Sequence, residues 1–264
     1  MALPQWELFA LRYATVARKP QENFIGAGAD PHETASHMDY FVWFARHEGD
    51  VVLVDIGFTA QAAAQRKRQF LRCPMASLNQ AGITLTDIGD TIITHAHYDH
   101  AGNIEQLPFT RFHLQAREMQ YATGPEMRHP FMRHAYDVED VCGLVRANHQ
   151  ERVVFADGDA EIRPGITVHW VGGHTQGLQI VRVHTRNGWM VLASDAAHYL
   201  ENLHRRAPFP IVYHVGDMMR GFDRVLSLAE TPEHIIPGHD PITSSSFKRV
   251  GPEGLDLFDL TVRI

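Results

Sequence analysis

The first part of the chain alternates apolar runs with polar segments that contain glycine and proline. The run WELFALRYATV at residues 6–16 is rich in β-favouring residues and predicts a strand. Residues 39–58 predict a hairpin, because two runs rich in Val, Phe and Trp flank turn residues at 48–50. Residues 18–38 between them have the composition of a loop. That loop is long for a compact domain, which favours a functional role such as lining a site.

Helical and extended segments alternate along the remainder of the chain. Residues 59–81 predict a helix bounded by Gly82, with Pro74 interrupting or restarting the pattern, and a short strand follows at 90–95. Further strands are predicted at 111–115, 151–155, 166–171, 178–185 and 189–195. Further helices are predicted at 115–122, 137–148 and 214–229.

This order of elements predicts an α/β (α+β) protein. Strands arrive in series with helices interspersed in both halves, which favours two sheets covered by helices over one parallel sheet wound by regular βαβ units. The sequence contains no internal repeat, low-complexity tract or linker. We therefore expect residues 1–264 to form a single domain, with an insert around 117–150 that serves the substrate or a dimer contact.

Composition and charge exclude several classes of protein. The 24 Lys and Arg against 31 Asp and Glu give a formal net charge of −7, and no basic run predicts a nucleic-acid partner. The first residues lack a basic segment followed by an apolar one, and no apolar stretch approaches about 18 residues. We expect no membrane insertion and a cytoplasmic location. Cys73 and Cys142 lie far apart and are expected to be free thiols.

Histidine is abundant, and the stretch THAHYDH concentrates it. Three histidines and an aspartate fall within six positions, at His95, His97, Asp99 and His100. Alternate side chains of an extended segment point the same way, so His95 and His97 can hold one ion. Asp99 and His100 diverge where the chain turns, and would serve a second ion beside the first. The alternative is that these histidines cluster by chance or hydrogen-bond in the core.

Three later segments supply further donors. His174 lies in VGGHTQG, Asp195 in VLASDAAHY and His239 in IIPGHDP, each where a strand passes into a loop. A rigid scaffold can aim a side chain from such a junction. One histidine of this kind is more often structural, but three junctions together favour a metal site.

This ordered set of residues resembles the metallo-β-lactamase superfamily, over essentially the whole chain. The resemblance implies an αβ/βα sandwich of two mixed β-sheets flanked by helices, with the metals at one edge. It also implies the ligands: His95, His97 and His174 for the first metal, Asp99, His100 and His239 for the second, and Asp195 as a bridge. Two such cations activate water, polarise a carbonyl and steady a departing oxygen, which predicts a hydrolase without a protein nucleophile.

Two features narrow this resemblance. A bridging Asp195, and no cysteine in any ligand segment, disfavour a β-lactamase, and His rather than Glu at position 97 disfavours the oxygen-reducing diiron relatives. The segments LRYA, ENFIG and DYFVW and the spacing of the later ligands resemble the N-acyl homoserine lactonase group. The resemblance implies opening of a lactone ring, with an N-acyl homoserine lactone as the first substrate. Another lactone, a cyclic amide, a thioester or a phosphodiester are the alternatives, and a metal-binding sensor is the non-enzymatic one.

One position departs from the lactonase pattern. The known lactonases carry a tyrosine three residues after the bridging aspartate, whereas here that residue is His198 and Tyr199 follows it. Either His198 replaces the phenol as hydrogen-bond donor or general acid, or a local shift brings Tyr199 into place. The alternative is that both residues only pack in the loop. With Asp99, these two residues are the candidate catalytic side chains.

Substrate contacts are expected from residues 18–38 and from residues 117–141. The second segment is rich in Met and aromatic residues, which make adaptable walls for an apolar ligand. The alternative is that they pack on the core or form a homodimer contact; they are Met119, Met127, Phe131, Met132 and Tyr136. The expected cofactor is a pair of divalent metal ions, zinc first and then Fe, Mn or Co. Three further histidines are expected to be structural: His169, His184 and His214.

Overall fold

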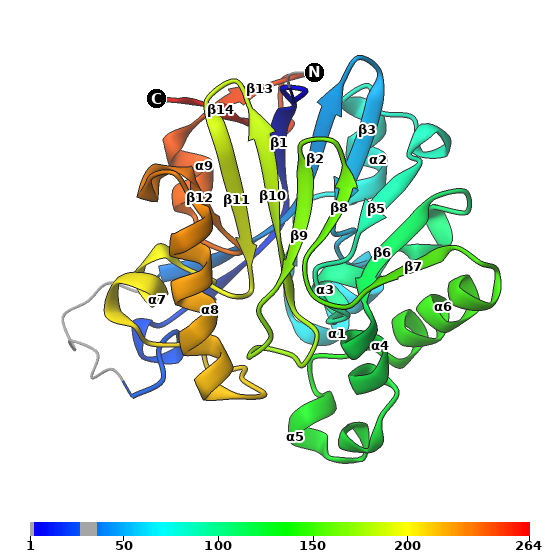
Figure 1. The fold of residues 1–264 in the computed structure, drawn as a ribbon, viewed down its shortest axis with the longest axis vertical. Helices are drawn as coiled ribbons and strands as arrows, with labels where there is room; N and C mark the ends of the chain where they lie inside the picture. The colour runs from blue at the N-terminus through cyan, green and yellow to red at the C-terminus, as the bar shows by residue number, and fades with distance from the viewer. Residues whose placement is uncertain (1–2, 27–35) are drawn as a thin grey trace.

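The protein is described by a computed structural model, which covers residues 3–26 and 36–264. Much of the predicted loop at 18–38 therefore lies outside the described residues. Within them, the strands form two sheets of nine and five strands, stacked face to face between layers of helices (Figure 1). The predicted αβ/βα sandwich is confirmed.

The large sheet is mixed. Its strands, in spatial order, are β13 (Phe247–Val250), β14 (Leu257–Arg263), β1 (Glu7–Arg18), β2 (Ser36–His47), β3 (Asp50–Val54), β5 (Asp90–Ile92), β6 (Arg111–Gln115) and β7 (Val153–Ala156), with β4 (Gln69–Phe70) paired to β1. The strands from β13 to β3 pair antiparallel, whereas β3, β5, β6 and β7 run parallel. The side chains at the ends of β3, β5 and β6 therefore emerge at one edge.

The small sheet is mixed as well. Its order is β12 (Ile235–Pro237), β11 (Gly188–Ser194), β10 (Gln179–Thr185), β9 (Ile166–Trp170) and β8 (Ala160–Arg163). Only β11 and β12 pair parallel, so the loops that follow them leave at the same edge. Both sheets thus present loops from several strands at one end of the sandwich.

Helices cover the outer faces of both sheets. The helices of the described residues are α1 (Ala60–Arg66), α2 (Pro74–Gln80), α3 (Tyr98–Ala101), α4 (Ala116–Ala122), α5 (Pro130–Arg133), α6 (Val138–His149), α7 (Leu200–Arg205), α8 (Val215–Leu228) and α9 (Ile242–Ser246). Short 3-10 turns lie at Pro20–Glu22, Leu85–Asp87, Ile104–Gln106, Pro125–Arg128 and Pro232–His234. No helix among the described residues has the length and apolar character needed to cross a membrane.

Three apolar layers hold the sandwich together. Side chains of the two sheets, such as Trp43 and Val181, pack against each other in the middle. A second layer joins the large sheet to α1, α2 and α6, and a third joins the small sheet to α8, where Phe222 is fully buried. β1 serves two layers because its side chains alternate: Leu8 faces the small sheet, and Phe9 faces the helices.

Two predicted elements differ in detail from the structure. The predicted interruption of the helix at 59–81 is confirmed, because α2 begins at Pro74. The first helix ends earlier than Pro74, because Lys67 has a positive φ of 56° and Phe70 then pairs with Ala14 of β1. The predicted strand at 90–95 ends at Ile92, because the backbone N–H of Thr94 donates to a side chain, the Asp55 carboxylate, at 2.8 Å. The other predicted strands and helices lie within a few residues of their expected bounds.

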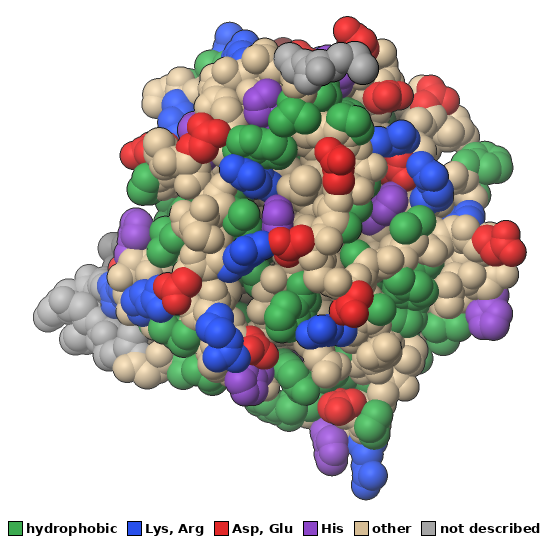
Figure 2. Space-filling model, viewed as in Figure 1, with side chains coloured by type: hydrophobic (Ala, Val, Ile, Leu, Met, Phe, Trp, Pro, Cys, Tyr) green, Lys and Arg blue, Asp and Glu red, His purple; other side chains and the backbone are tan. Residues whose placement is uncertain are grey.

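Charged side chains of both signs are interspersed on the face drawn in Figure 2.

A cluster of charges around the buried carboxylate of Asp90 links the two sheets at the start of β5. Asp90 is buried and lies 2.7 Å from His113 Nε2, 2.9 Å from Arg111 Nη2 and 2.5 Å from Arg163 Nη2. Arg163 belongs to the small sheet and the other residues to the large one. Burial of Asp90 opposes its charge, but His113 and the two arginines lower its pKa to about 2.

We expect Asp90→Asn to lower the free energy of unfolding at pH 7 by about 1–2 kcal/mol, because it removes the charge that buried His113 and two partly exposed arginines face. Urea unfolding measures this. The contribution of Asp90 is complete above an unfolded-state pKa of about 4 and is lost as the pH falls through about 2. The gap between variant and wild type should therefore shrink in acid. Asp87→Asn, which changes an exposed neighbour, is the control; an equal effect of both substitutions would contradict the prediction.

Candidate metal centre

All seven predicted ligands lie in loops or short helices that follow strands at one end of the sandwich. His95 and His97 follow β5, and Asp99 and His100 lie on α3 directly after them. The others come from the small sheet: His174 follows β9, Asp195 follows β11 and His239 follows β12. Every one of these side chains is buried. The structure brings the predicted set together.

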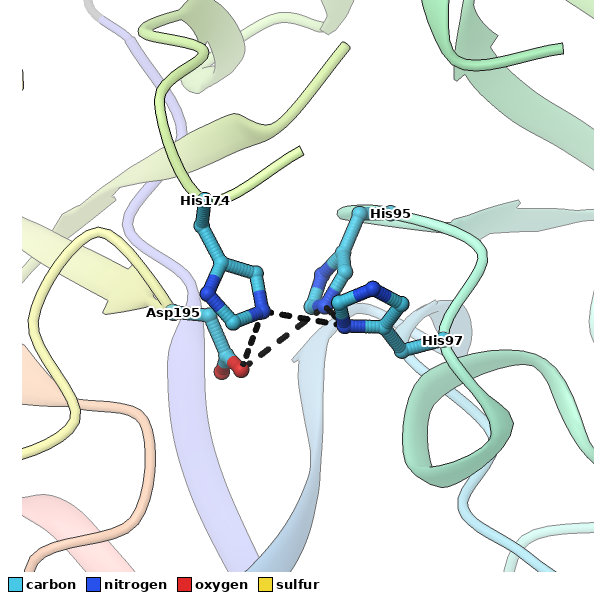
Figure 3. Close-up of side chains that lie close together, drawn as sticks. All are labelled: His95, His97, His174 and Asp195. Atoms are coloured by element: carbon cyan, nitrogen blue, oxygen red, sulfur yellow. Dashed lines mark hydrogen bonds and ion pairs between the residues drawn. The ribbon is translucent and has the colours of Figure 1, made fainter. Parts of the chain in front are cut away.

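The first group of donors consists of His95, His97 and His174. Their side chains point toward one another and toward Asp195 (Figure 3). His97 Nδ1 lies 3.0 Å from His95 Nε2 and 2.9 Å from His174 Nε2. Asp195 Oδ2 is 3.1 Å from His174 Nε2 and 3.7 Å from His95 Nε2. These four residues each offer one atom, all within 4.8 Å of one another, and could hold a metal ion.

The second group consists of Asp99, His100 and His239. Its two imidazole Nε2 atoms each lie 3.8 Å from Asp99 Oδ2. They also face the other oxygen of Asp195, because Oδ1 is 3.3 Å from His100 Nε2 and 3.0 Å from His239 Nε2. These three residues also offer atoms close enough to hold a metal ion. Asp195 thus turns one carboxylate oxygen to each group.

The outward nitrogens of three of these histidines are fixed by protein acceptors. His100 Nδ1 lies 2.8 Å from Asp55 Oδ2, His174 Nδ1 2.7 Å from the Ile211 carbonyl and His239 Nδ1 2.8 Å from the Asp39 carbonyl. Each of these acceptors can receive a hydrogen bond from Nδ1, which turns the Nε2 atom inward. Partners of this kind orient metal-binding histidines in known sites.

Asp55 joins the two sheets beside the site. Its carboxylate accepts from the Thr94 backbone N–H and hydroxyl, both at 2.8 Å, as well as from His100. The Thr94 hydroxyl lies 2.8 Å from Ser194 Oγ of the small sheet and 3.2 Å from His95 Nδ1. Asp55 and Ser194 both adopt a positive φ, of 57° and 44°, which costs energy for residues other than glycine. This strained network holds the ligand-bearing turns in place.

The electrostatics of the two groups differ. Burial lowers the pKa of His95 and His97 well below the ordinary value, and neighbouring imidazoles lower it further, so both rings are neutral. Burial acts in the same direction on His100, but Asp195, Asp55 and Asp99 together raise its pKa well above the ordinary value. The carboxylates therefore draw positive charge into the second group.

Buried nitrogen and oxygen atoms that form no hydrogen bond show whether a metal would fit the centre. Three buried atoms have no hydrogen-bond partner among the described residues: His100 Nε2, His239 Nε2 and Asp195 Oδ1. A buried polar atom without a partner costs free energy, and these three converge on one point. Imidazole nitrogens and carboxylate oxygens are ligands that Zn, Fe, Mn and Co accept. The residues present fit such ions.

His198 and Tyr199 are placed differently. His198 is buried and stacks on Phe209, with ring centroids 3.8 Å apart and planes 7° apart, and its Nε2 lies 3.1 Å from Asp195 Oδ2. Burial lowers the pKa of His198 to about 3, although Asp195 opposes this. Tyr199 caps α7 and its hydroxyl lies 3.4 Å from the His37 carbonyl. His198 also forms a possible donor group with Asp195 and His239.

A narrow pocket opens beside His97 and His174. Its open volume is only about 10 Å³, and its other lining residues are Tyr121, Phe131, Met132, His134, Ile211, Val212 and Tyr213. Phe131 and Met132 come from the segment predicted to contact a substrate. Met119 and Met127 pack on the core, and Tyr136 is buried against the ring of His97.

Sequence reasoning missed several supporting residues. Asp55 was noted only as the end of a strand, and Glu118, which is fully buried beside the ligand loops, was not singled out. A buried acid directly after an apolar strand, as in LVDIGF, is the signal that could have indicated Asp55. Three histidines serve other roles, as expected: His169 pairs with Asp159, His184 contacts the Pro4 carbonyl and His214 caps α8.

Comparison with known proteins adds to this geometry. The family model described as the metallo-beta-lactamase superfamily matches residues 38–239. An N-acyl homoserine lactonase from Azorhizobium caulinodans is 27% identical over 192 residues. The match covers 66% of this chain and 66% of that relative, just under two thirds of the relative's length.

Solved structures are similar over most of the chain. One is a quorum-quenching N-acyl homoserine lactone lactonase, with a TM-score of 0.74, 20% identity and coverage of 90% of this chain and 93% of the other. Another is AidC, a dizinc quorum-quenching lactonase in complex with its product, with a TM-score of 0.74, 18% identity and coverage of 100% and 95%. At these identities the likeness establishes the fold alone.

Proposed function

Because the chain belongs to the metallo-beta-lactamase superfamily, we propose that it is a dinuclear metal-dependent hydrolase that opens a lactone ring. N-acyl homoserine lactones are the first substrate class, as in the lactonase relative. The observation that carries the dinuclear part is the shared carboxylate. Asp195 lies 3.1 Å from a histidine of the first group through one oxygen and 3.0 Å from a histidine of the second group through the other.

The roles of the residues follow from their positions. His95, His97 and His174 would hold the first ion, and Asp99, His100 and His239 the second, with Asp195 between them. The two divalent cations would be zinc or, as alternatives, Fe, Mn or Co. When bound, they would lower the pKa of a bound water toward neutrality and polarise a carbonyl. The protein keeps the imidazole rings oriented through Asp55 and through backbone carbonyls, so little reorganisation is needed.

The pocket beside His97 favours a neutral, apolar substrate. Apart from histidines its lining is aromatic or aliphatic, and neither Lys nor Arg is among its lining residues. A phosphodiester would call for cationic anchors beside the metals. An acyl chain or an uncharged ring fits such walls better.

Substrate entry requires α5 to move. The narrow pocket is too small for a substrate, and Phe131 and Met132 of α5 form part of its wall. Pro130 and Arg133 of the same short helix line a separate cavity of about 480 Å³. α5 therefore has room to withdraw from the metal centre. The insert around 117–150 would in this way control access of the substrate to the metal centre.

Three further expectations stay predictions. They are a role of this insert in a homodimer, the single-domain organisation of residues 1–264 and a cytoplasmic location.

His198 would assist ring opening in place of a tyrosine. Its ring is held by the stack on Phe209 and its Nε2–H is directed at the metal-facing oxygen of Asp195. If Asp195 Oδ2 binds a metal ion, this N–H would be released and could donate a hydrogen bond to an oxygen atom of the substrate. His198 also supports a second candidate function. Because it replaces the tyrosine of the known lactonases, the same centre could instead hydrolyse another lactone, a cyclic amide or a thioester.

Metal analysis and a substrate panel test the function. We expect about two divalent ions per chain after purification with zinc. A pH-indicator assay should then detect acid release from N-acyl homoserine lactones, and a chelator should abolish it. Acid release from a thioester or a phosphodiester but from no lactone would overturn the substrate class. A single bound ion would overturn the dinuclear centre.

A paired comparison tests the donor. His198→Ala should lower kcat about 100-fold, the usual loss on removing one preorganised donor, at unchanged metal content. Tyr199→Phe should lower kcat no more than about threefold, because the bond from its hydroxyl to the His37 carbonyl is long, at 3.4 Å. Steady-state rates and metal content of each purified variant provide the measurement. The reverse order of effects would assign the role to Tyr199, and unchanged rates in both would remove it from this loop.

A further inference from the structure

We propose that Glu118 is a positioning residue that holds the two loops of the first histidine group together and so sets the affinity of that metal site alone. The proposal rests on the proposed dinuclear centre. Glu118 lies in the first turn of α4, at the end of β6, and its side chain is fully buried. It would not touch the metal or the substrate; it would act through the loops.

One carboxylate contacts both loops. Oε1 accepts hydrogen bonds from the Ala96 backbone N–H at 2.9 Å and from the Tyr136 hydroxyl at 2.9 Å. Oε2 accepts from the Thr175 hydroxyl at 2.6 Å and from the Gly177 backbone N–H at 3.0 Å. Ala96 lies between His95 and His97, and Thr175 directly follows His174. The carboxylate thus ties the loop of two ligands to the loop of the third.

The four bonds use the full capacity of an ionised carboxylate. Its two oxygens offer about four lone-pair sites, and the four donors fill them. Hydrogen bonds to a charged acceptor are about twice as strong as those between neutral groups. Among the residues that the structure describes, no Lys or Arg forms an ion pair with Glu118. Its negative charge is therefore held by dipoles, and it favours a cation in the neighbouring histidine group.

The backbone around Glu118 supports the same interpretation. A Cβ atom at Gly177 would lie 2.2 Å from the backbone nitrogen of Glu118 and 2.5 Å from its Cα. Only glycine lets the loop after His174 pass this close to α4. Tyr136, whose hydroxyl binds Glu118, packs its ring edge-on against His97 at 4.6 Å between centroids. Glu118 therefore fixes the surroundings of His97 and His174 as well as the loop backbones.

The second histidine group has different supports. His100 is held by Asp55, and His239 by the Asp39 carbonyl. None of the four donors to Glu118 lies next to these residues in the sequence. Loss of the Glu118 carboxylate should therefore weaken the first site and leave the second unchanged. A purely structural role would weaken both sites together.

Glu118→Gln isolates this effect with little change in volume. The amide of glutamine offers one oxygen and one NH₂ group, so one pair of donors would face another donor. The hydroxyls of Tyr136 and Thr175 can rotate, but the N–H groups of Ala96 and Gly177 cannot. One of the two loops therefore loses its anchor.

The test measures metal affinity without any substrate. Zn²⁺ or Co²⁺ is titrated in competition with a chromogenic chelator, in a His239→Ala background that keeps the first site and in a His174→Ala background that keeps the second. Adding Glu118→Gln should weaken binding about 10- to 100-fold in the first background, as is usual for lost outer-shell partners, and by less than about threefold in the second. The visible spectrum of bound Co²⁺ should change only in the first.

Controls separate this outcome from general damage. Glu139→Gln makes the same substitution at an exposed position of α6 and should change neither affinity. Tyr136→Phe removes one donor while keeping the carboxylate and should weaken the first site about fivefold; it also serves if Glu118→Gln does not fold. Equal weakening of both sites, or no weakening of the first, would overturn the proposal. Failure of every lactone as a substrate would leave it intact.

Discussion

A single carboxylate that turns one oxygen to each of two histidine groups is the interaction on which the site depends. Asp195 Oδ2 faces His174 at 3.1 Å and Oδ1 faces His239 at 3.0 Å. With three more buried imidazoles and a second carboxylate around it, this arrangement concentrates donor atoms where water is excluded. Such a cluster is costly unless ions occupy it, because several of its atoms have no partner among the described residues.

The sandwich fold explains how so many donor side chains come together at one place. Parallel pairing of β3, β5 and β6 in one sheet and of β11 and β12 in the other brings their loops to one end. The loop after β9, which carries His174, leaves at the same end because β9 and β11 both pair antiparallel with β10. The loops that carry Asp195 and His239 also approach each other closely, because Gly238 has no side chain. A Cβ atom at Gly238 would lie 2.6 Å from the Ser194 carbonyl oxygen. Three apolar layers hold the sheets and helices at fixed separations. The ligand loops therefore extend from elements that are held together by apolar packing.

Two sheets with helices could be predicted from the order of local signals, whereas the sandwich and the set of seven candidate ligands followed from the resemblance of an ordered series of residues to a known superfamily. Runs of apolar residues mark most strands, and His95, His97 and Asp99 lie within one short motif. Glu118 could not be found in this way, because its partners lie at positions 96, 136, 175 and 177 and meet only in the folded chain. The restart of the helix at Pro74 was predicted, but the short strand before it was not, because it forms by pairing of Phe70 with Ala14, which is also a tertiary effect. The different positions of His198 and Tyr199 could not be predicted from the sequence. They depend on the stack of His198 on Phe209 and on the place of Tyr199 at the N-cap of α7, which exist only in the folded chain.

Anomalous X-ray diffraction from crystals grown with zinc is the most direct test of the shared carboxylate. Data collected on either side of the zinc absorption edge locate each ion without assumptions about its ligands. The account predicts two anomalous peaks about 3.5–4 Å apart, one within reach of each oxygen of Asp195. The peak on the Oδ2 side should be surrounded by His95, His97 and His174. A single peak, or a second peak away from Asp195, would contradict the account.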